Sequence, residues 1–166
     1  MLTQMRDLGF DVRQQARAEV LIEEALKTSE IEGERLDPNA VRSSVAQRLG
    51  LPTAGMVSIK NQQADGVVQI LLDATQNFRQ ALTPERLFGW HAALFPTGYS
   101  GMHKIKVASW RDDRNGPMKV VSGPIGREII HYEAPPAERL ANEMNRFLCW
   151  WEESRKEMDG LLLDSM

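Results

Sequence analysis

Two short patterns mark where helices begin in this chain, and they constrain its fold more than any other sequence feature. In Asp37-Pro38 and in Thr83-Pro84, a residue that can cap a helix stands directly before a proline. The cap oxygen can accept a hydrogen bond from a free N–H group of the first turn, and proline fits the first helical position because an N–H group there would have no partner. Each pattern therefore predicts the start of an α-helix. Gly50 and Pro96 predict where these two helices end.

Three further helices are predicted from apolar residues that recur at helical spacing. The first covers Asp11–Glu32 and ends at Gly33, which can adopt a positive φ. The next follows a loop at Leu51–Asn61, and the last begins after Pro135-Pro136. The residues predicted to form the buried stripes of these three helices are Val12, Ala16, Val20, Ala25, Leu26 and Ser29; Val67, Ile70, Leu71, Ala74 and Phe78; and Leu140, Met144, Phe147, Leu148 and Trp151.

The segment Thr97–Pro136 has a different character, because glycines separate short runs of β-branched or aromatic residues. These runs are Ile105–Trp110, Met118–Val121 and Ile129–Tyr132. The last two runs suggest a β-hairpin with a loop longer than the commonest two-residue turn. The predicted fold class is therefore mainly α, with one small β-hairpin.

The composition is that of an ordinary globular domain, with 166 residues of which 42% are hydrophobic and 26% charged. A net charge of −3 and an isoelectric point near 5.7 argue against a surface dedicated to nucleic acid. No stretch approaches the roughly 18 apolar residues of a membrane span, and no signal-peptide pattern begins the chain, so a cytoplasmic location is expected. Cys149 stands among apolar residues and is predicted to be a small buried thiol.

Residue types alone predict no complete active site. His91, His103 and His131 show no metal-ligand spacing and have no set of cysteine partners, so no metal site is predicted. No serine or cysteine stands in a nucleophile elbow, and no glycine-rich phosphate loop precedes a helix.

An acidic cluster at the end of the first predicted helix is the one local irregularity. Glu30, Glu32 and Glu34 lie at the negative end of the helix dipole, where a carboxylate costs roughly 0.3 to 1 kcal/mol. Thr28 and Glu32 are four residues apart and share one face of the helix. The pattern fits a solvated, fraying helix end, or a functional site that places a hydroxyl and a carboxylate together.

The run Thr28-x-x-x-Glu32-Gly33 resembles the inhibitory motif of Fic proteins, Ser/Thr-x-x-x-Glu-Gly/Asn, in the class whose inhibitory helix precedes the catalytic core. The resemblance continues through TSEIEGERLDPNAVRSSVAQRLGL, LTPERLFGWHAALFPTGYSG and SWRDDRNGPMKVVSGPIGREIIHYEAPPAERL. In order and without large gaps, these stretches look like the front part of bacterial Fic proteins. The resemblance implies a Fic-like helical bundle, with residues 1–50 as a region that holds the inhibitory helix at about 11–33, and residues 51–166 as an incomplete Fic domain.

Fic proteins transfer AMP from ATP to a hydroxyl group of a target protein. They use the motif His-Pro-Phe-x-x-Gly-Asn-Gly-Arg-x-x-Arg, which is absent from this sequence. The resemblance therefore implies no catalytic residue in this chain. It implies that ATP and Mg²⁺ serve the intact enzyme and do not bind tightly here, and that the catalytic histidine, the magnesium-binding acid and the phosphate-binding arginines follow Met166. We expect the chain alone to transfer nothing.

Two elements match the family residue by residue. Thr28, Glu32 and Gly33 match the inhibitory motif, in which the glutamate pairs with the second arginine of the missing motif and keeps the γ-phosphate of ATP from seating productively. The hairpin at about 118–132 resembles the flap that holds the target. Its predicted docking strand consists of Met118, Lys119, Val120, Val121 and Ser122. Without the resemblance, an ordinary edge hairpin is the simpler interpretation.

The implied partners are a target protein on the flap and a catalytic Fic core in the same polypeptide, with no nucleic acid and no membrane. Homo-oligomer formation is left open. The alternative function is a stand-alone, antitoxin-like helical module that inhibits a separate Fic core. A nucleic-acid adaptor is a third hypothesis, which the acidic isoelectric point disfavours.

Overall fold

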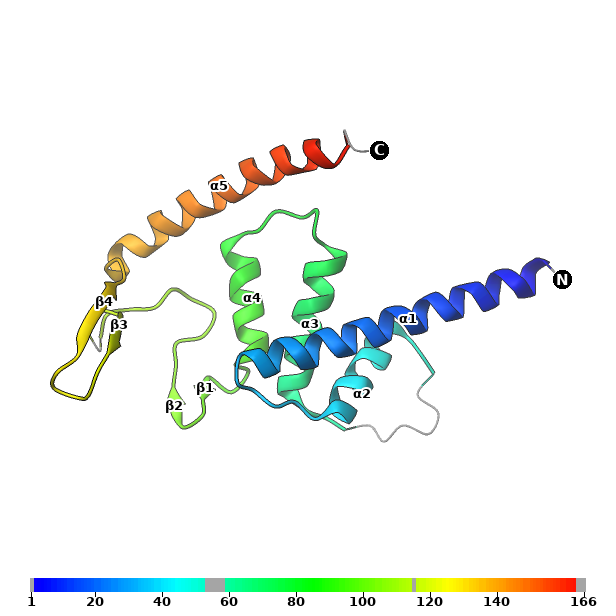
Figure 1. Cartoon of the computed structure of the whole chain (residues 1–166), viewed down its shortest axis with the longest axis horizontal. Coiled ribbons are helices and arrows are strands. Elements are labelled where there is room, and N and C mark those ends of the chain that lie inside the picture. The colour runs from blue at the N-terminus through cyan, green and yellow to red at the C-terminus, as the bar shows by residue number, and fades with distance from the viewer. Residues whose placement is uncertain (1, 53–58, 115, 164–166) are drawn as a thin grey trace. The chain divides into compact units, whose positions relative to one another are not determined.

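The computed structural model describes residues 2–52, 59–114 and 116–163, and the side chains of 12–52, 59–114 and 116–156. Within these ranges the chain forms five helices and two small antiparallel sheets of two strands each (Figure 1). The elements are α1 (Leu2–Ile31), α2 (Pro38–Leu49), α3 (Gln62–Gln76), α4 (Pro84–Leu94), β1 (Tyr99–Ser100), β2 (His103–Lys104), β3 (Lys119–Ser122), β4 (Ile129–Glu133) and α5 (Ala137–Leu163). The fold is mainly α with a small β-hairpin, as predicted. None of the helices in the described ranges combines the length and the hydropathy that a membrane span requires.

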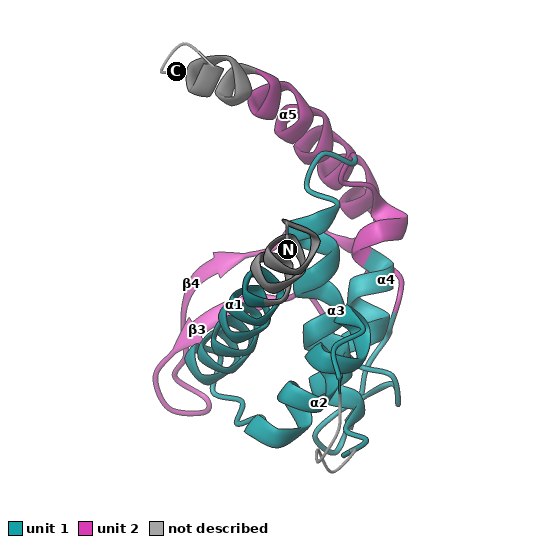
Figure 2. Cartoon of the chain, turned by 90° about the vertical axis from the view of Figure 1, so that its right-hand side faces the viewer, with its two compact units in different colours: residues 1–80, 88–107 teal, residues 81–87, 108–166 magenta. Residues whose placement is uncertain are grey.

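The chain divides into two compact units, which Figure 2 shows in different colours. The first consists of residues 1–80 and 88–107, and the second of residues 81–87 and 108–166. The boundary predicted at residue 50 falls inside the first unit, and the proposed Fic division stays a prediction.

The core of the first unit lies where α1, α2 and α3 contact one another. α2 begins and ends as its sequence predicts, because the Asp37 carboxylate accepts a hydrogen bond of 2.9 Å from the N–H of Asn39 and Gly50 adopts a φ of +65°. The most deeply buried side chains of this core are Ala25, Ala40, Val41, Val45, Ala64 and Val68.

α1 differs from its prediction in two ways. It begins at Leu2, well before Asp11, and the residues predicted for its buried stripe are partly wrong: Val12 and Val20 are 64% and 66% exposed, and Ala16 is exposed as well. The predicted stripe contained a five-residue step from Val20 to Ala25, which turns the helix about 140° away from the starting face. The buried stripe runs instead through Ala18, Leu21, Ile22, Ala25 and Ser29, at steps of one, three and four residues.

α3 and α4 approach closely at a glycine. A Cβ atom on Gly66 would lie 2.0 Å from the backbone oxygen of Ala93, so only glycine fits there. The two helices are also joined by a hydrogen bond of 2.8 Å from the indole N–H of Trp90 to Asp73. Phe78, predicted for the buried stripe of α3, lies beyond the last helical residue and is 59% exposed.

In the second unit, a loop and a helix end are tied together. Arg111 pairs with Asp113 and donates a hydrogen bond to the carbonyl of Pro135. The other Asp113 oxygen accepts a hydrogen bond of 2.7 Å from the N–H of Ala137, the first residue of α5. The run Ile105–Trp110 forms no strand, contrary to its prediction, because Ala108 adopts a φ of +55° that interrupts extended backbone.

α5 buries less of its predicted stripe than expected. Leu148 is buried, whereas Phe147 and Trp151 are 42% and 37% exposed. Cys149 is exposed, so the prediction of a buried thiol is wrong. The neighbouring residue Leu148 points inward. Because a step of one residue turns a helix by about 100°, Cys149 lies on a different side of α5.

A carboxylate on α5 holds the start of α4 within the second unit. Glu152 accepts a hydrogen bond of 3.1 Å from the N–H of Leu82 and forms an ion pair of 2.8 Å with Arg155. The Leu82 N–H, followed by the Arg155 guanidinium, lowers the pKa of Glu152 below its ordinary value.

Candidate functional site

A groove of about 450 Å³ lies in the first unit at the C-terminal end of α1. We call it the Glu32 groove. Its polar rim consists of the exposed residues Thr28, Glu32, Glu34 and Gln63, and the buried Ser29 also lines the groove. Its floor is apolar and consists of Val67, Ile70, Leu71, Leu94 and Phe95. The segment around residue 30 and the segments around residues 65 and 95 thus meet in one site that no single stretch of sequence reveals.

The end of α1 is closed by a pair of backbone hydrogen bonds that hold Glu32 in place. Gly33 adopts a φ of +81°, as its predicted role as a helix stop requires. The N–H of Glu34 donates to the carbonyl of Ser29 at 2.8 Å, and the N–H of Gly33 donates to the carbonyl of Glu30 at 3.0 Å. These are the two bonds of a Schellman motif, which satisfies carbonyl groups that a helix end otherwise leaves free. Glu32 therefore stands on a well-formed helix end and not on a fraying one.

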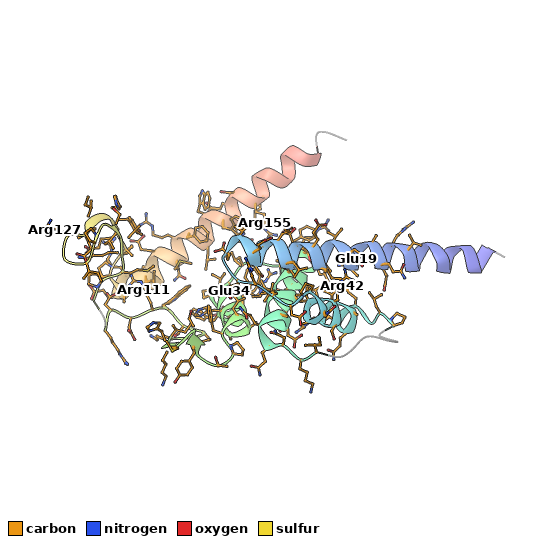
Figure 3. All side chains as sticks on the ribbon, turned by 60° about the horizontal axis from the view of Figure 1, so that its bottom comes forward. Glu19, Glu34, Arg42, Arg111, Arg127 and Arg155 are labelled. Carbon is orange, nitrogen blue, oxygen red and sulfur yellow. The ribbon has the colours of Figure 1, made fainter. Side chains whose placement is uncertain are left out.

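The three glutamates of the acidic cluster have different surroundings. Glu30 forms an ion pair of 3.0 Å with Lys27 and thereby raises the pKa of Lys27. Glu34 accepts a hydrogen bond of 3.1 Å from the side-chain amide of Gln63, and Figure 3 labels it. For Glu32, no described residue forms an ion pair or a hydrogen bond with the carboxylate. Among the three glutamates, Glu32 is therefore the one whose carboxylate is not paired with a described residue.

Two hydroxyl residues of α1, Thr28 and Ser29, line the groove and differ in burial. Thr28 is exposed on the rim, with its hydroxyl 3.5 Å from a carboxylate oxygen of Glu24. Ser29, which the sequence placed only in a buried stripe, is 6% exposed and also lines the groove. Gln63 was not predicted, because no local pattern connects residues 34 and 63.

The second predicted site, the strand Met118–Ser122, lies in the second unit. β3 pairs with β4 in register Val120 to Tyr132, and the N–H of Ala134 donates to the carbonyl of Met118 at 2.9 Å. Inward and outward backbone groups alternate along an antiparallel strand, so the N–H and C=O groups of Lys119 and Val121 point away from β4. In the described part of the chain, β4 is the one strand that pairs with β3.

The hairpin carries exposed side chains throughout. Every residue of β3 and β4 is exposed, including Val120 at 53% and Val121 at 47%. The register shifts between these two valines, and near this bulge the hydroxyl of Ser122 lies 2.6 Å from Nε2 of His131. Lys119 and Glu133 form an ion pair of 3.1 Å across the strands. The open edge and the exposed valines give an extended peptide both backbone and apolar contacts.

A family model described as a domain of unknown function, DUF4172, matches residues 1–51. The matched segment contains α1, Glu32 with Gly33, and the whole of α2, and it ends before α3 and the hairpin. A search of curated proteins finds no match.

Proposed function

We propose that this chain is the regulatory and target-docking part of a Fic-family protein adenylyltransferase. In this proposal Glu32 pairs with an arginine of the catalytic core and so competes with the γ-phosphate of ATP for that arginine. Thr28 and Gly33 belong to the same inhibitory element, and Met118–Ser122 holds the segment of the target that receives AMP. ATP and Mg²⁺ bind the catalytic core, and the chain acts in the cytoplasm.

The unpaired state of the Glu32 carboxylate is the observation that carries the proposal. It stands on a helix end closed by two backbone hydrogen bonds, at the rim of an apolar groove, without a cation among the described residues. An arginine guanidinium can form two parallel hydrogen bonds with a carboxylate, and the same donors suit a phosphate. A carboxylate held in this way occupies donors that the phosphate needs.

The apolar floor of the Glu32 groove supports docking of a further protein segment at this place. Five apolar side chains line the groove together with the Glu32 carboxylate and four other polar residues. Removing apolar side chains from water is favourable, so a protein segment that covers this floor is stabilised there. The same segment excludes solvent from the glutamate–arginine pair and so strengthens the pair.

The test uses a protein that carries this chain ahead of a catalytic core with the His-Pro-Phe motif. Glu32→Gly should raise AMP transfer from labelled ATP by at least about 10-fold, since a charged hydrogen-bonded pair contributes about 1.5 to 3 kcal/mol. Glu30→Gly is the matched control. It removes the same charge at nearly the same place in the helix, but Glu30 is paired with Lys27 and does not line the groove.

Equal activation by Glu32→Gly and Glu30→Gly would show that loosening of the helix end, and not one placed carboxylate, controls transfer. Glu34→Gly is unsuitable as a control, although the sequence placed Glu34 beyond the helix end, because Glu34 lines the same groove and binds Gln63. Adding the chain to a separately purified Fic core distinguishes the antitoxin-like alternative, which requires inhibition between separate polypeptides.

A further inference from the structure

The hairpin of β3 and β4 carries an apolar pair of side chains on each of its two faces. Successive side chains of a strand point to opposite faces, so Val120 and Val121 lie on different faces. Val120 pairs with Tyr132, and Val121 pairs with Ile130. Residues paired across two strands share a face. The four side chains are 47% to 56% exposed, so both faces present uncovered apolar surface.

No other described helix or strand covers these apolar pairs. Among the elements of the described chain, β3 lies against β4 alone and β4 lies against β3 alone (Figure 1). A two-stranded hairpin is marginally stable in water by itself, and a third strand is one addition that stabilises it. The free edge of β3, where the backbone groups of Lys119 and Val121 point outward, can accept such a strand.

The division of the apolar pairs between two faces decides which kind of partner covers both. A helix or a flat surface that packs on the hairpin covers one face and leaves the other in water. A strand added at the edge places its own side chains alternately on the two faces, so two consecutive residues of that strand contact both pairs. The added strand therefore removes more apolar surface from water than a partner on one face does.

The charges on the two strands are already paired. Lys119 forms an ion pair of 3.1 Å with Glu133, and Nε2 of His131 lies 2.6 Å from the hydroxyl of Ser122. A charged residue of the partner placed beside the valines would lose contact with water without gaining an unpaired opposite charge on these strands. The positions beside the valines therefore favour uncharged residues.

We propose that the segment docked on β3 is an extended peptide with two consecutive apolar, uncharged residues. One of them packs beside Val120 and Tyr132, and the next packs beside Val121 and Ile130 on the other face. This inference rests on the proposed function for the role of the strand, and it adds the class of target sequence that the strand selects. Backbone hydrogen bonds hold any extended peptide at the edge, and the two apolar pairs favour this pattern over an alternating one.

The test compares two peptides with blocked ends, and it follows their binding to the 166-residue chain through the chemical shifts of the β3 amide protons. Lys-Thr-Val-Val-Thr-Lys places its valines on both faces, whereas Lys-Val-Thr-Val-Thr-Lys has the same composition and places them on one face. The first peptide should bind about 3-fold more tightly, because it forms one more cross-strand apolar pair. Equal or reversed affinities would overturn the proposal, as would the absence of any shift at about 2 mM peptide.

Val120→Thr and Val121→Thr test the two faces separately. Threonine keeps the β-branched shape and the strand preference of valine but replaces a methyl group with a hydroxyl. Each variant should bind the first peptide about 3-fold more weakly, while nuclear Overhauser contacts between β3 and β4 persist. A loss in only one of the two variants would indicate a partner on one face and would overturn the proposal.

Ile125→Thr is the matched control, because it removes a β-branched apolar side chain that is 99% exposed and lies in the loop between the strands. It should leave the affinity unchanged, and a loss equal to that of the valine variants would mean unspecific apolar adhesion and overturn the proposal. These measurements need neither ATP nor a catalytic core. If binding depends on both valines while Glu32→Gly and Val121→Pro leave AMP transfer unchanged in a core-bearing protein, the proposed function fails and the peptide preference stands.

Discussion

At the residue scale, Gly33 fixes the place where α1 ends and so the place where Glu32 stands. Its φ of +81° belongs to the left-handed region, which a residue with a Cβ atom adopts at a cost of roughly 1 to 2 kcal/mol. Apart from Gly33 itself and its two chain neighbours, no atom of the described residues lies within 4 Å of the position of an added Cβ, so this cost comes from the backbone alone. Gly33→Ala should therefore lower the free energy of unfolding by about 1 kcal/mol, as measured by urea denaturation.

Gly89 provides the opposite case in the same unit. It lies inside α4, and an added Cβ there also meets open space, but its φ is not positive. Gly89→Ala should raise the free energy of unfolding by up to about 1 kcal/mol, because alanine is the better helix former. A loss of stability in both variants would contradict this account, since it would imply that crowding, and not backbone conformation, decides the outcome.

The residues at helix ends could be predicted because their partners are close in sequence. Asp37 and Gly50 bond to groups within five residues, and so does Gly33. Glu32 could be singled out by its position against the helix dipole and by the family resemblance. The sequence could not predict that the Glu32 carboxylate is unpaired. This depends on which glutamate each of two neighbouring side chains binds: Lys27 pairs with Glu30, and Gln63 binds Glu34, which lies 29 positions away in the sequence.

At the scale of elements, the sequence predicted which segments are helical better than which face each helix buries. Many apolar residues of α1 stand outside its buried stripe, so more than one stripe could be drawn through them. Packing against α2 and α3 selects the stripe of Ala18, Ala25 and Ser29. The hairpin was predicted from two apolar runs, whereas the third run, Ile105–Trp110, forms no strand because Ala108 adopts a φ of +55°.

The pairing of β3 with β4 determines which substitution tests the docking strand. The N–H of Val121 points to the open edge, so Val121→Pro should remove one donor and keep the hairpin, since proline is tolerated on the free side of an edge strand. In a protein with a catalytic core, labelling of the target should fall at least about 5-fold, in keeping with the loss of one hydrogen bond of about 1 kcal/mol. ATP affinity, measured by calorimetry, should not change.

Val120→Pro is the informative comparison, because the N–H of Val120 points toward Tyr132 in β4. This substitution should break the pairing of β3 with β4, which nuclear Overhauser contacts between the strands would reveal. Unchanged labelling of the target by the Val121→Pro protein, with its hairpin intact, would exclude Met118 to Ser122 as the docking edge.

At the scale of the whole molecule, burial is distributed unevenly between the two units. The first unit contains Val41, Val45 and Val68, each at most 1% exposed, whereas every residue of β3 and β4 in the second unit is exposed. Regions with few buried contacts open locally at low free energy, and a packed core opens only when its unit unfolds. We therefore expect amide protons of α2 to exchange far more slowly than those of the hairpin.

Val45→Ala tests whether the two units unfold separately. The change removes two buried methyl groups and leaves a cavity, which should cost about 2 kcal/mol and speed amide exchange roughly 30-fold in α1, α2 and α3. Hydrogen exchange followed by mass spectrometry should show no change in β3 and β4, because their local opening does not involve this core. Val120→Ala, at a site 53% exposed on the hairpin, should do the reverse and alter exchange in the hairpin alone. If Val45→Ala speeds exchange in the hairpin by the same factor as in α2, the units unfold as one, because the hairpin then depends on the core for its stability.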